Sequence, residues 1–167
     1  MKRLLCGAAV AAALLISATP SSAQVVNLTA TLTGAEETTP TPGLLGLLTG
    51  AVGTATVSVD AAAEEIAVTL ALFNFSTGTT AGHIHVGPRG VAGPIVLNFP
   101  IPTGRTGDLP LTFRLGTAAF VARPEIGIAT FQDAIQAIVG GGAYVNIHTS
   151  ANPGGEIRGQ LIPVPVR

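Results

Sequence analysis

Three histidines are the residues through which this sequence could perform chemistry. His83 and His85 are separated by one residue in the glycine-bounded segment 82–90, and His148 lies in a segment of similar composition, 145–149. Residues two apart on a strand point to the same side, so the side chains of His83 and His85 would share one face. Imidazole nitrogens in threes suit Cu(II), or Zn(II) with an open coordination position. The sequence therefore predicts a candidate metal site at His83, His85 and His148, for copper first and for zinc second.

Polar residues near the end of the chain would surround these imidazoles. The same alternation puts Asn146 on one face with His148, and Glu156 on one face with Arg158. If the strands that carry them are neighbours, the three histidines are ringed by Asn146, Glu156 and Arg158, whose hydrogen bonds would orient the metal ligands. A structural role is the alternative. In that case the histidines hydrogen-bond to loop backbone and to Glu156, and they hold the glycine-rich turns in place.

No catalytic residue is predicted. Ser150 follows His148 closely, but no acid is placed to orient a triad and no Gly-x-Ser-x-Gly motif is present in the sequence. Glu36 and Glu37 are adjacent, so on a strand they would face opposite sides and would not work as a carboxylate pair. A metal ion is therefore the one cofactor that the sequence suggests.

The first residues predict export. Lys2 and Arg3 precede an apolar run, 4–16, and Ser-Ser-Ala at 21–23 is the kind of sequence that signal peptidase cleaves. The apolar run is shorter than the roughly 20 residues that span a membrane. We expect residues 1–23 to be a signal peptide cut after Ala23, and the mature protein to be periplasmic or secreted. Cleavage would also remove the single cysteine, so the mature chain would have no disulfide.

The composition narrows the class of partner. The chain has a formal net charge of -1, and Lys2 is its only lysine. Recognition of nucleic acid depends on clustered basic groups, so we expect no nucleic-acid partner. After signal cleavage no run is long and apolar enough to span a membrane. We expect the partner to be an extracellular or envelope protein, and the sequence indicates no particular oligomeric state.

Periodicity predicts an all-β, antiparallel fold. Apolar and polar residues alternate with a period of two along most of the chain, and prolines or glycines separate the alternating stretches. About eight strands are expected, at 26–33, 54–59, 66–72, 81–86, 94–99, 111–115, 143–149 and 156–162. A short amphipathic helix is expected near 131–139, where apolar residues recur at i, i+3, i+4 and i+7. This pattern is typical of a Greek-key sandwich or barrel.

Two motifs carry a family resemblance. Residues 81–96 read Ala-Gly-His-Ile-His-Val-Gly-Pro-Arg-Gly-Val-Ala-Gly-Pro-Ile-Val, and residues 143–149 read Ala-Tyr-Val-Asn-Ile-His-Thr, followed at 152–161 by Asn-Pro-Gly-Gly-Glu-Ile-Arg-Gly-Gln-Leu. Together they resemble the CHRD domain, a module named from the extracellular protein chordin and widespread in exported bacterial proteins. The resemblance implies one β-sandwich-like CHRD domain over residues 24–167, with no settled activity for bacterial members. The apolar segment Leu44 to Leu48 departs from the family's usual short link.

A second resemblance concerns the histidines. Copper-zinc superoxide dismutase is a Greek-key barrel whose copper strand also carries His-x-His and whose later strand supplies a further histidine. By this likeness His83, His85 and His148 would be the copper positions, and the fold would be superoxide-dismutase-like as an alternative to immunoglobulin-like. The chain departs from that enzyme because it has no fourth histidine, no zinc loop and no disulfide.

Three hypotheses about function follow. The first is an exported, non-enzymatic binding module with an unknown ligand. The second is a periplasmic or secreted protein that binds copper, or zinc, at the three histidines. The third is an oxidoreductase of the superoxide dismutase kind, which has the second resemblance as its only support. The three imidazoles must converge on a common centre for either metal hypothesis to hold.

Overall fold

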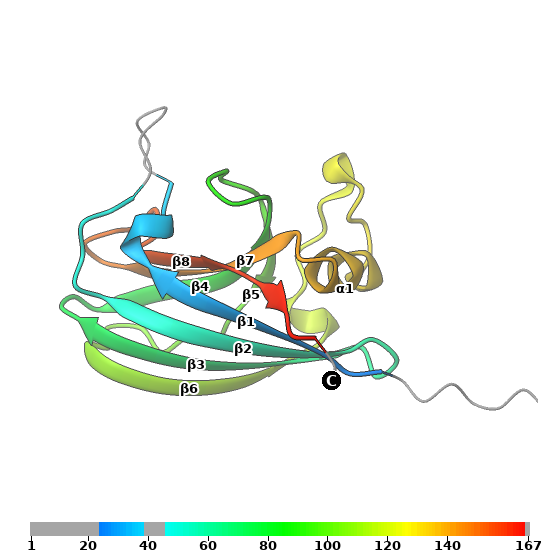
Figure 1. Ribbon diagram of the computed structural model, residues 1–167, viewed down its shortest axis with the longest axis horizontal. Coiled ribbons are helices and arrows are strands. Elements are labelled where there is room, and N and C mark those ends of the chain that lie inside the picture. Colours follow the sequence, from blue (N-terminus) through cyan, green and yellow to red (C-terminus); the bar gives the residue numbers. More distant parts are fainter. Residues whose placement is uncertain (1–23, 39–45, 166–167) are drawn as a thin grey trace, which may run out of the picture.

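A computed structural model of the protein describes residues 24–38 and 46–165 (Figure 1). The predicted signal peptide, residues 1–23, lies outside the described residues, and so do Leu44 and Leu45 of the apolar segment that departs from the family pattern. At the end of that segment Leu47 is half-buried and Leu48 is fully exposed.

Within the described residues the chain forms nine strands and four short helices. The strands are β1 (Val26–Thr33), β2 (Val52–Asp60), β3 (Glu65–Phe75), β4 (Thr79–Val86), β5 (Ile95–Asn98), β6 (Gly107–Leu115), β7 (Ala143–Thr149), β8 (Ile157–Gln160) and β9 (Ile162–Pro163). The helices are α1 (Phe131–Val139) and three single 3-10 turns, η1 (Gly34–Glu36), η2 (Thr117–Ala119) and η3 (Pro124–Ile126). No helix among residues 24–38 and 46–165 is long and apolar enough to cross a membrane.

The strands form one antiparallel sheet that curls into a half-barrel. Their order is β5-β4-β7-β8-β1-β2-β3-β6, and β9 also pairs with β1. The last strands thus return to lie beside the first, which is the arrangement of a Greek key. Figure 1 shows the half that contains β1, β2, β3 and β6 curving beneath the half that contains β4, β7 and β8. The expected all-β antiparallel fold with one short helix is confirmed.

Alternation along the strands builds the core. In β1, β2 and β3 the inward residues Leu28, Val57 and Val68 are fully buried, while Thr56 and Thr69 on the intervening positions are exposed. β-branched residues suit both faces of such strands. The predicted helix α1 is present and packs beside β7, with buried residues at the expected spacing: Phe131, Ala134, Ile135 and Ile138. A capping box between Thr130 and Asp133 fixes its start.

One predicted strand differs from the structure. The stretch expected to run unbroken over 156–162 is divided between β8, which pairs with β7, and β9, which pairs with β1. The division falls at Leu161, whose backbone nitrogen still donates to Ala143 O of β7 and whose side chain is buried. After that residue the chain follows β1, where the backbone N–H of Val164, just past β9, donates to Asn27 O at 2.8 Å.

The register of the central strands places the histidines. Ile84 of β4 is fully buried in the core, so its neighbours His83 and His85 lie on the outer face of the sheet. His83 is opposite Asn146 of β7, and Asn146 is in turn opposite Arg158 of β8. A row of polar residues therefore crosses three adjacent strands on the outer face.

Candidate metal centre

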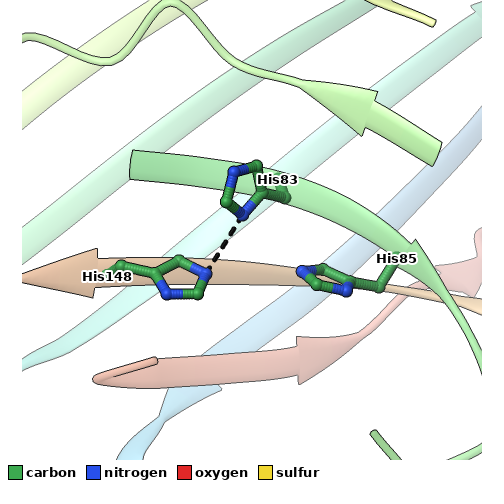
Figure 2. Close-up of side chains that lie close together, drawn as sticks. All are labelled: His83, His85 and His148. Atoms are coloured by element: carbon green, nitrogen blue, oxygen red, sulfur yellow. Dashed lines mark hydrogen bonds between the residues drawn. The ribbon is translucent and has the colours of Figure 1, made fainter. Parts of the chain in front are cut away.

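The three histidines meet on the outer face of β4 and β7. The ring centres of His83 and His148 are 4.8 Å apart, those of His83 and His85 are 5.5 Å apart, and those of His85 and His148 are 6.4 Å apart. Figure 2 shows His83 above the space between the other two rings, with one nitrogen of each ring turned toward that space. One nitrogen from each ring lies within 4.8 Å of the other two, and all three residues are half-buried.

Backbone carbonyls fix the orientation of two rings. The Nδ1 of His85 lies 2.8 Å from the carbonyl oxygen of Gly93, and the Nδ1 of His148 lies 2.8 Å from that of Pro153. A carbonyl oxygen only accepts, so each Nδ1 carries the proton and each Nε2 carries a lone pair. The Nε2 of His85 is buried and has no hydrogen-bond partner. Metal-ligating histidines are typically held by a second hydrogen bond of this kind.

The third ring faces one of these lone pairs. The Nδ1 of His83 lies 3.0 Å from the Nε2 of His148 (Figure 2). Because that Nε2 is unprotonated, Nδ1 of His83 donates in the metal-free protein. A metal ion would take the place of this proton, and neutral His83 would then carry its proton on Nε2. The donors would be His83 Nδ1, His85 Nε2 and His148 Nε2.

The spacing of the nitrogens is compatible with a small cation. Zinc–imidazole bonds of 2.0 to 2.1 Å in tetrahedral geometry put ligand nitrogens about 3.3 Å apart. The nitrogens of the His83–His148 pair are already close to this separation, at 3.0 Å. The widest pair of the cluster, at no more than 4.8 Å, would close by about 1.5 Å through ring rotation.

The electrostatic environment keeps all three imidazoles neutral near pH 7. Burial, with a smaller contribution from the neighbouring histidines, lowers the pKa of His83 from 6.5 to about 4. Burial also lowers the pKa of His85 to about 4, assisted by the charges of Arg158 and Arg123, although the Gly93 carbonyl opposes the shift. The pKa of His148 is lowered as well, chiefly by burial. A neutral imidazole is the form that binds a metal ion.

A stack of planar groups supports His85 from one side. The rings of His85 and Tyr144 are nearly parallel, at 7° and with 4.8 Å between centres. The guanidinium carbon of Arg158 lies 3.4 Å from the centre of the Tyr144 ring. The Tyr144 hydroxyl accepts a hydrogen bond from the backbone N–H of Gly93 at 2.9 Å. The backbone of Gly93 therefore holds both side chains, His85 through its carbonyl oxygen and Tyr144 through its N–H.

Of the three residues predicted to surround the histidines, Arg158 and Asn146 lie in the polar row beside them. Arg158 is almost fully buried, stacks on Tyr144 and donates to the carbonyl oxygen of Pro88. Asn146 is directly across from His83, and its Nδ2 donates to Glu37 at 2.6 Å.

The third residue, Glu156, forms its hydrogen bonds away from the histidines. Its carboxylate accepts from Thr49 at 2.6 Å, from Asn152 at 3.1 Å and from Thr149. No hydrogen bond within residues 24–38 and 46–165 joins Glu156 to a histidine. Burial opposes ionisation of this carboxyl, but the three donors outweigh it and hold its pKa below the usual value.

Three residues that matter here were not predicted. Tyr144 could have been found, because it shares the period-two face of β7 with Asn146 and His148. Gly93 and Glu37 could not, since both reach the site from loops. Glu37 is 3% exposed, and burial raises its pKa to about 7 against the opposing influence of Arg158.

Comparisons with known proteins give one match. A family model described as the CHRD domain matches residues 28–161. The resemblance noted in the sequence is thereby confirmed. No curated protein and no solved structure matches the chain.

Proposed function

Because the chain belongs to the CHRD domain family, we propose that it is an exported, non-enzymatic binding module whose ligand is a single transition-metal ion held by His83, His85 and His148. Export is supported by the composition of residues 1–23. The family leaves the ligand open, and the histidine cluster is the part of the described chain best suited to supply one.

One observation carries the metal proposal: the Nε2 of His85 is buried without a hydrogen-bond partner, beside two further imidazole nitrogens. A buried polar atom without a partner costs about 1–3 kcal/mol. A purely structural histidine would avoid that cost by turning its second nitrogen to a donor or to water. Coordination of a metal ion would remove it.

The ligand set favours copper over zinc. Affinity of a nitrogen site for divalent metals rises to a maximum at Cu(II) and falls at Zn(II). The set has no cysteine sulfur to favour a softer ion, because the only cysteine of the chain is Cys6. We therefore assign Cu(II) as the preferred ion and Zn(II) as the competitor.

Titration of the purified, untagged protein with Cu(II) and with Zn(II) tests the proposal. A tag-free protein is needed because a histidine tag would itself bind both ions. We expect one equivalent of Cu(II) to bind, more tightly than Zn(II), and electron paramagnetic resonance of the copper form to show coupling to several imidazole nitrogens.

The double variant His83→Ala/His85→Ala should lose this binding. Thr69→Ala is the matched control, because Thr69 is an exposed residue on the outer face of the other half of the sheet. Wild-type protein that binds neither ion, with the double variant merely less stable, would make the histidines structural. The ligand of the module would then be sought among extracellular or envelope proteins.

The oxidoreductase hypothesis depends on the same result. Copper binding by the three histidines would be its first requirement, and assay of the copper-loaded protein for superoxide dismutation would be its test. Absence of activity in a protein that binds copper would leave the binding function in place.

A further inference from the structure

The side-chain amide of Asn146, next to the histidines, has a hydrogen-bond partner for its nitrogen but none for its oxygen. Asn146 is 4% exposed, and its Nδ2 donates to the carboxylate of Glu37 at 2.6 Å. Its Oδ1 is buried and has no hydrogen-bond partner. The structure places the amide nitrogen, and not the oxygen, against Glu37 Oε1. The oxygen is therefore the unpartnered atom.

The strand order indicates where this oxygen lies. Glu37 follows β1 and η1, which pack beside β8 on one side of β7. On the other side of β7 is β4, where His83 is the direct cross-strand neighbour of Asn146. The two arms of a planar amide diverge, so an amide whose nitrogen is held by Glu37 turns its oxygen away from that carboxylate.

We propose that Asn146 supplies a fourth donor to the metal centre, through its carboxamide oxygen, and that Glu37 holds the amide in the orientation that presents this oxygen. The inference depends on the proposed metal function. It accounts for both unpartnered atoms near the centre, His85 Nε2 and Asn146 Oδ1, with a single ion. The resulting set of three nitrogens and one oxygen is one that Cu(II) accepts in tetragonal geometry.

Glu37 also contributes charge. A divalent cation beside the buried guanidinium of Arg158 is disfavoured by repulsion, and the nearby carboxylate of Glu37 offsets this. The Asn146–Glu37 hydrogen bond additionally polarises the amide, which makes its oxygen a better donor.

Gly155 makes the Asn146–Glu37 arrangement possible. A Cβ at Gly155 would lie 2.8 Å from both carboxylate oxygens of Glu37 and 2.7 Å from Asn146 Nδ2. Its backbone φ of +133° is also one that glycine adopts readily. A glycine is therefore required where the loop before β8 covers this hydrogen bond.

Copper titration and electron paramagnetic resonance of Asn146 variants test the inference. Asn146→Leu, which removes the oxygen at similar size, should weaken Cu(II) binding about 10–100-fold and change the copper hyperfine splitting. Asn146→Asp is combined with Glu37→Gln, because aspartate alone would put two carboxylates in contact. The double variant keeps a hydrogen bond between the two side chains and an oxygen at the metal, so it should bind Cu(II) more tightly than Glu37→Gln alone. If Asn146→Leu fails to fold, the aspartate variant still decides, because a merely structural amide would give no gain from the added carboxylate.

Gln160→Leu is the matched control. Gln160 also has a buried oxygen without a partner, but its nitrogen donates to Gly87 and Gly141. This variant should bind copper as wild type does.

Glu37→Leu should weaken binding, while Glu37→Gln, which retains an acceptor for Asn146, should weaken it less.

Two results would overturn the inference, and they can be distinguished. If wild type and Asn146→Leu bind Cu(II) equally and have the same spectrum, Asn146 is no ligand and the three-histidine site stands. If the wild-type protein binds no metal, the proposed function fails and the inference fails with it.

Discussion

His85 and Gly93 are joined by a hydrogen bond of 2.8 Å, in which the imidazole Nδ1 donates to the peptide oxygen. A Cβ at Gly93 would lie 1.8 Å from the carbonyl oxygen of Val86, so only glycine allows this approach. The turn after β4 therefore determines which nitrogen of His85 is free to bind a metal.

Gly93→Ala should displace the peptide and release both His85 and Tyr144. We expect a fall in the free energy of unfolding of about 2 kcal/mol or more, with a loss of copper affinity of at least tenfold. Urea denaturation and copper titration measure the two effects. Gly154→Ala is the control, because a Cβ at Gly154 meets no atom within 4 Å. Equal behaviour of the two variants would show that Gly93 does not position the site.

Arg158→Lys tests the stack behind His85. Lysine keeps the charge but lacks the planar group that lies over Tyr144 and donates to Pro88. We expect the free energy of unfolding to fall by about 2 kcal/mol. Arg114→Lys should have no measurable effect, because Arg114 forms an exposed ion pair with Glu65. Equal stabilities of the two variants by urea denaturation would contradict a role for the stack.

The positions of the strands along the chain, and the residues that face the core, could be predicted because alternation is a local property. Ile84 between His83 and His85, and Val145 and Ile147 around Asn146, already indicate which residues face the core. The helix could be predicted for the same reason, since Phe131, Ala134, Ile135 and Ile138 define one stripe. The division of the last strand at Leu161 could not, because it depends on which neighbouring strand the chain pairs with.

The surroundings of the histidines were only partly predictable. Asn146 and Arg158 lie near the cluster because they are on strands whose faces alternation determines. Glu156 is two residues before Arg158, so alternation predicts the same face for both. It precedes β8, however, and its carboxylate accepts hydrogen bonds from Thr49, Thr149 and Asn152. Glu37 is 109 positions from Asn146 in the chain, so only the folded loops bring the two together.

Glu156→Ala should separate stability from metal binding. The buried carboxylate joins the end of β7, at Thr149, to the loop residues Thr49 and Asn152. Hydrogen bonds to a charged group contribute about 1.5–3 kcal/mol each. We therefore expect the free energy of unfolding to fall by about 4.5 kcal/mol or more, with copper affinity unchanged in the fraction that remains folded. Glu125→Ala, at an exposed position in η3, is the control. A parallel loss of copper affinity would place Glu156 among the residues that orient the ligands.

The lowered pKa values of the histidines predict that acid destabilises the metal-free protein. Between pH 6.5, the unperturbed value, and about pH 4, the value for folded His83 and His85, the unfolded chain binds protons that the folded chain excludes. Stability from this source is complete above pH 6.5 and falls as the pH falls toward 4. Urea denaturation in the presence of a chelator, from pH 8 to pH 4.5, measures the dependence.

The raised pKa of Glu37 should change stability with pH in the opposite direction. A comparison of wild type with Glu37→Gln therefore separates the glutamate effect from the histidine effect. Its pKa is raised from 4.5 to about 7, so between these values the folded chain holds a proton that the unfolded chain lacks, and acidification favours folding. In the wild-type protein the loss of stability on acidification that the histidines cause is therefore partly offset by the gain that Glu37 causes. Glu37→Gln removes the second, and its stability should fall more steeply than that of wild type between pH 7 and pH 4.5. If the two proteins lost stability with falling pH at the same rate, Glu37 would be ionised in the folded protein at pH 5. Its burial would then have to be offset by a stronger electrostatic interaction than the one with Arg158.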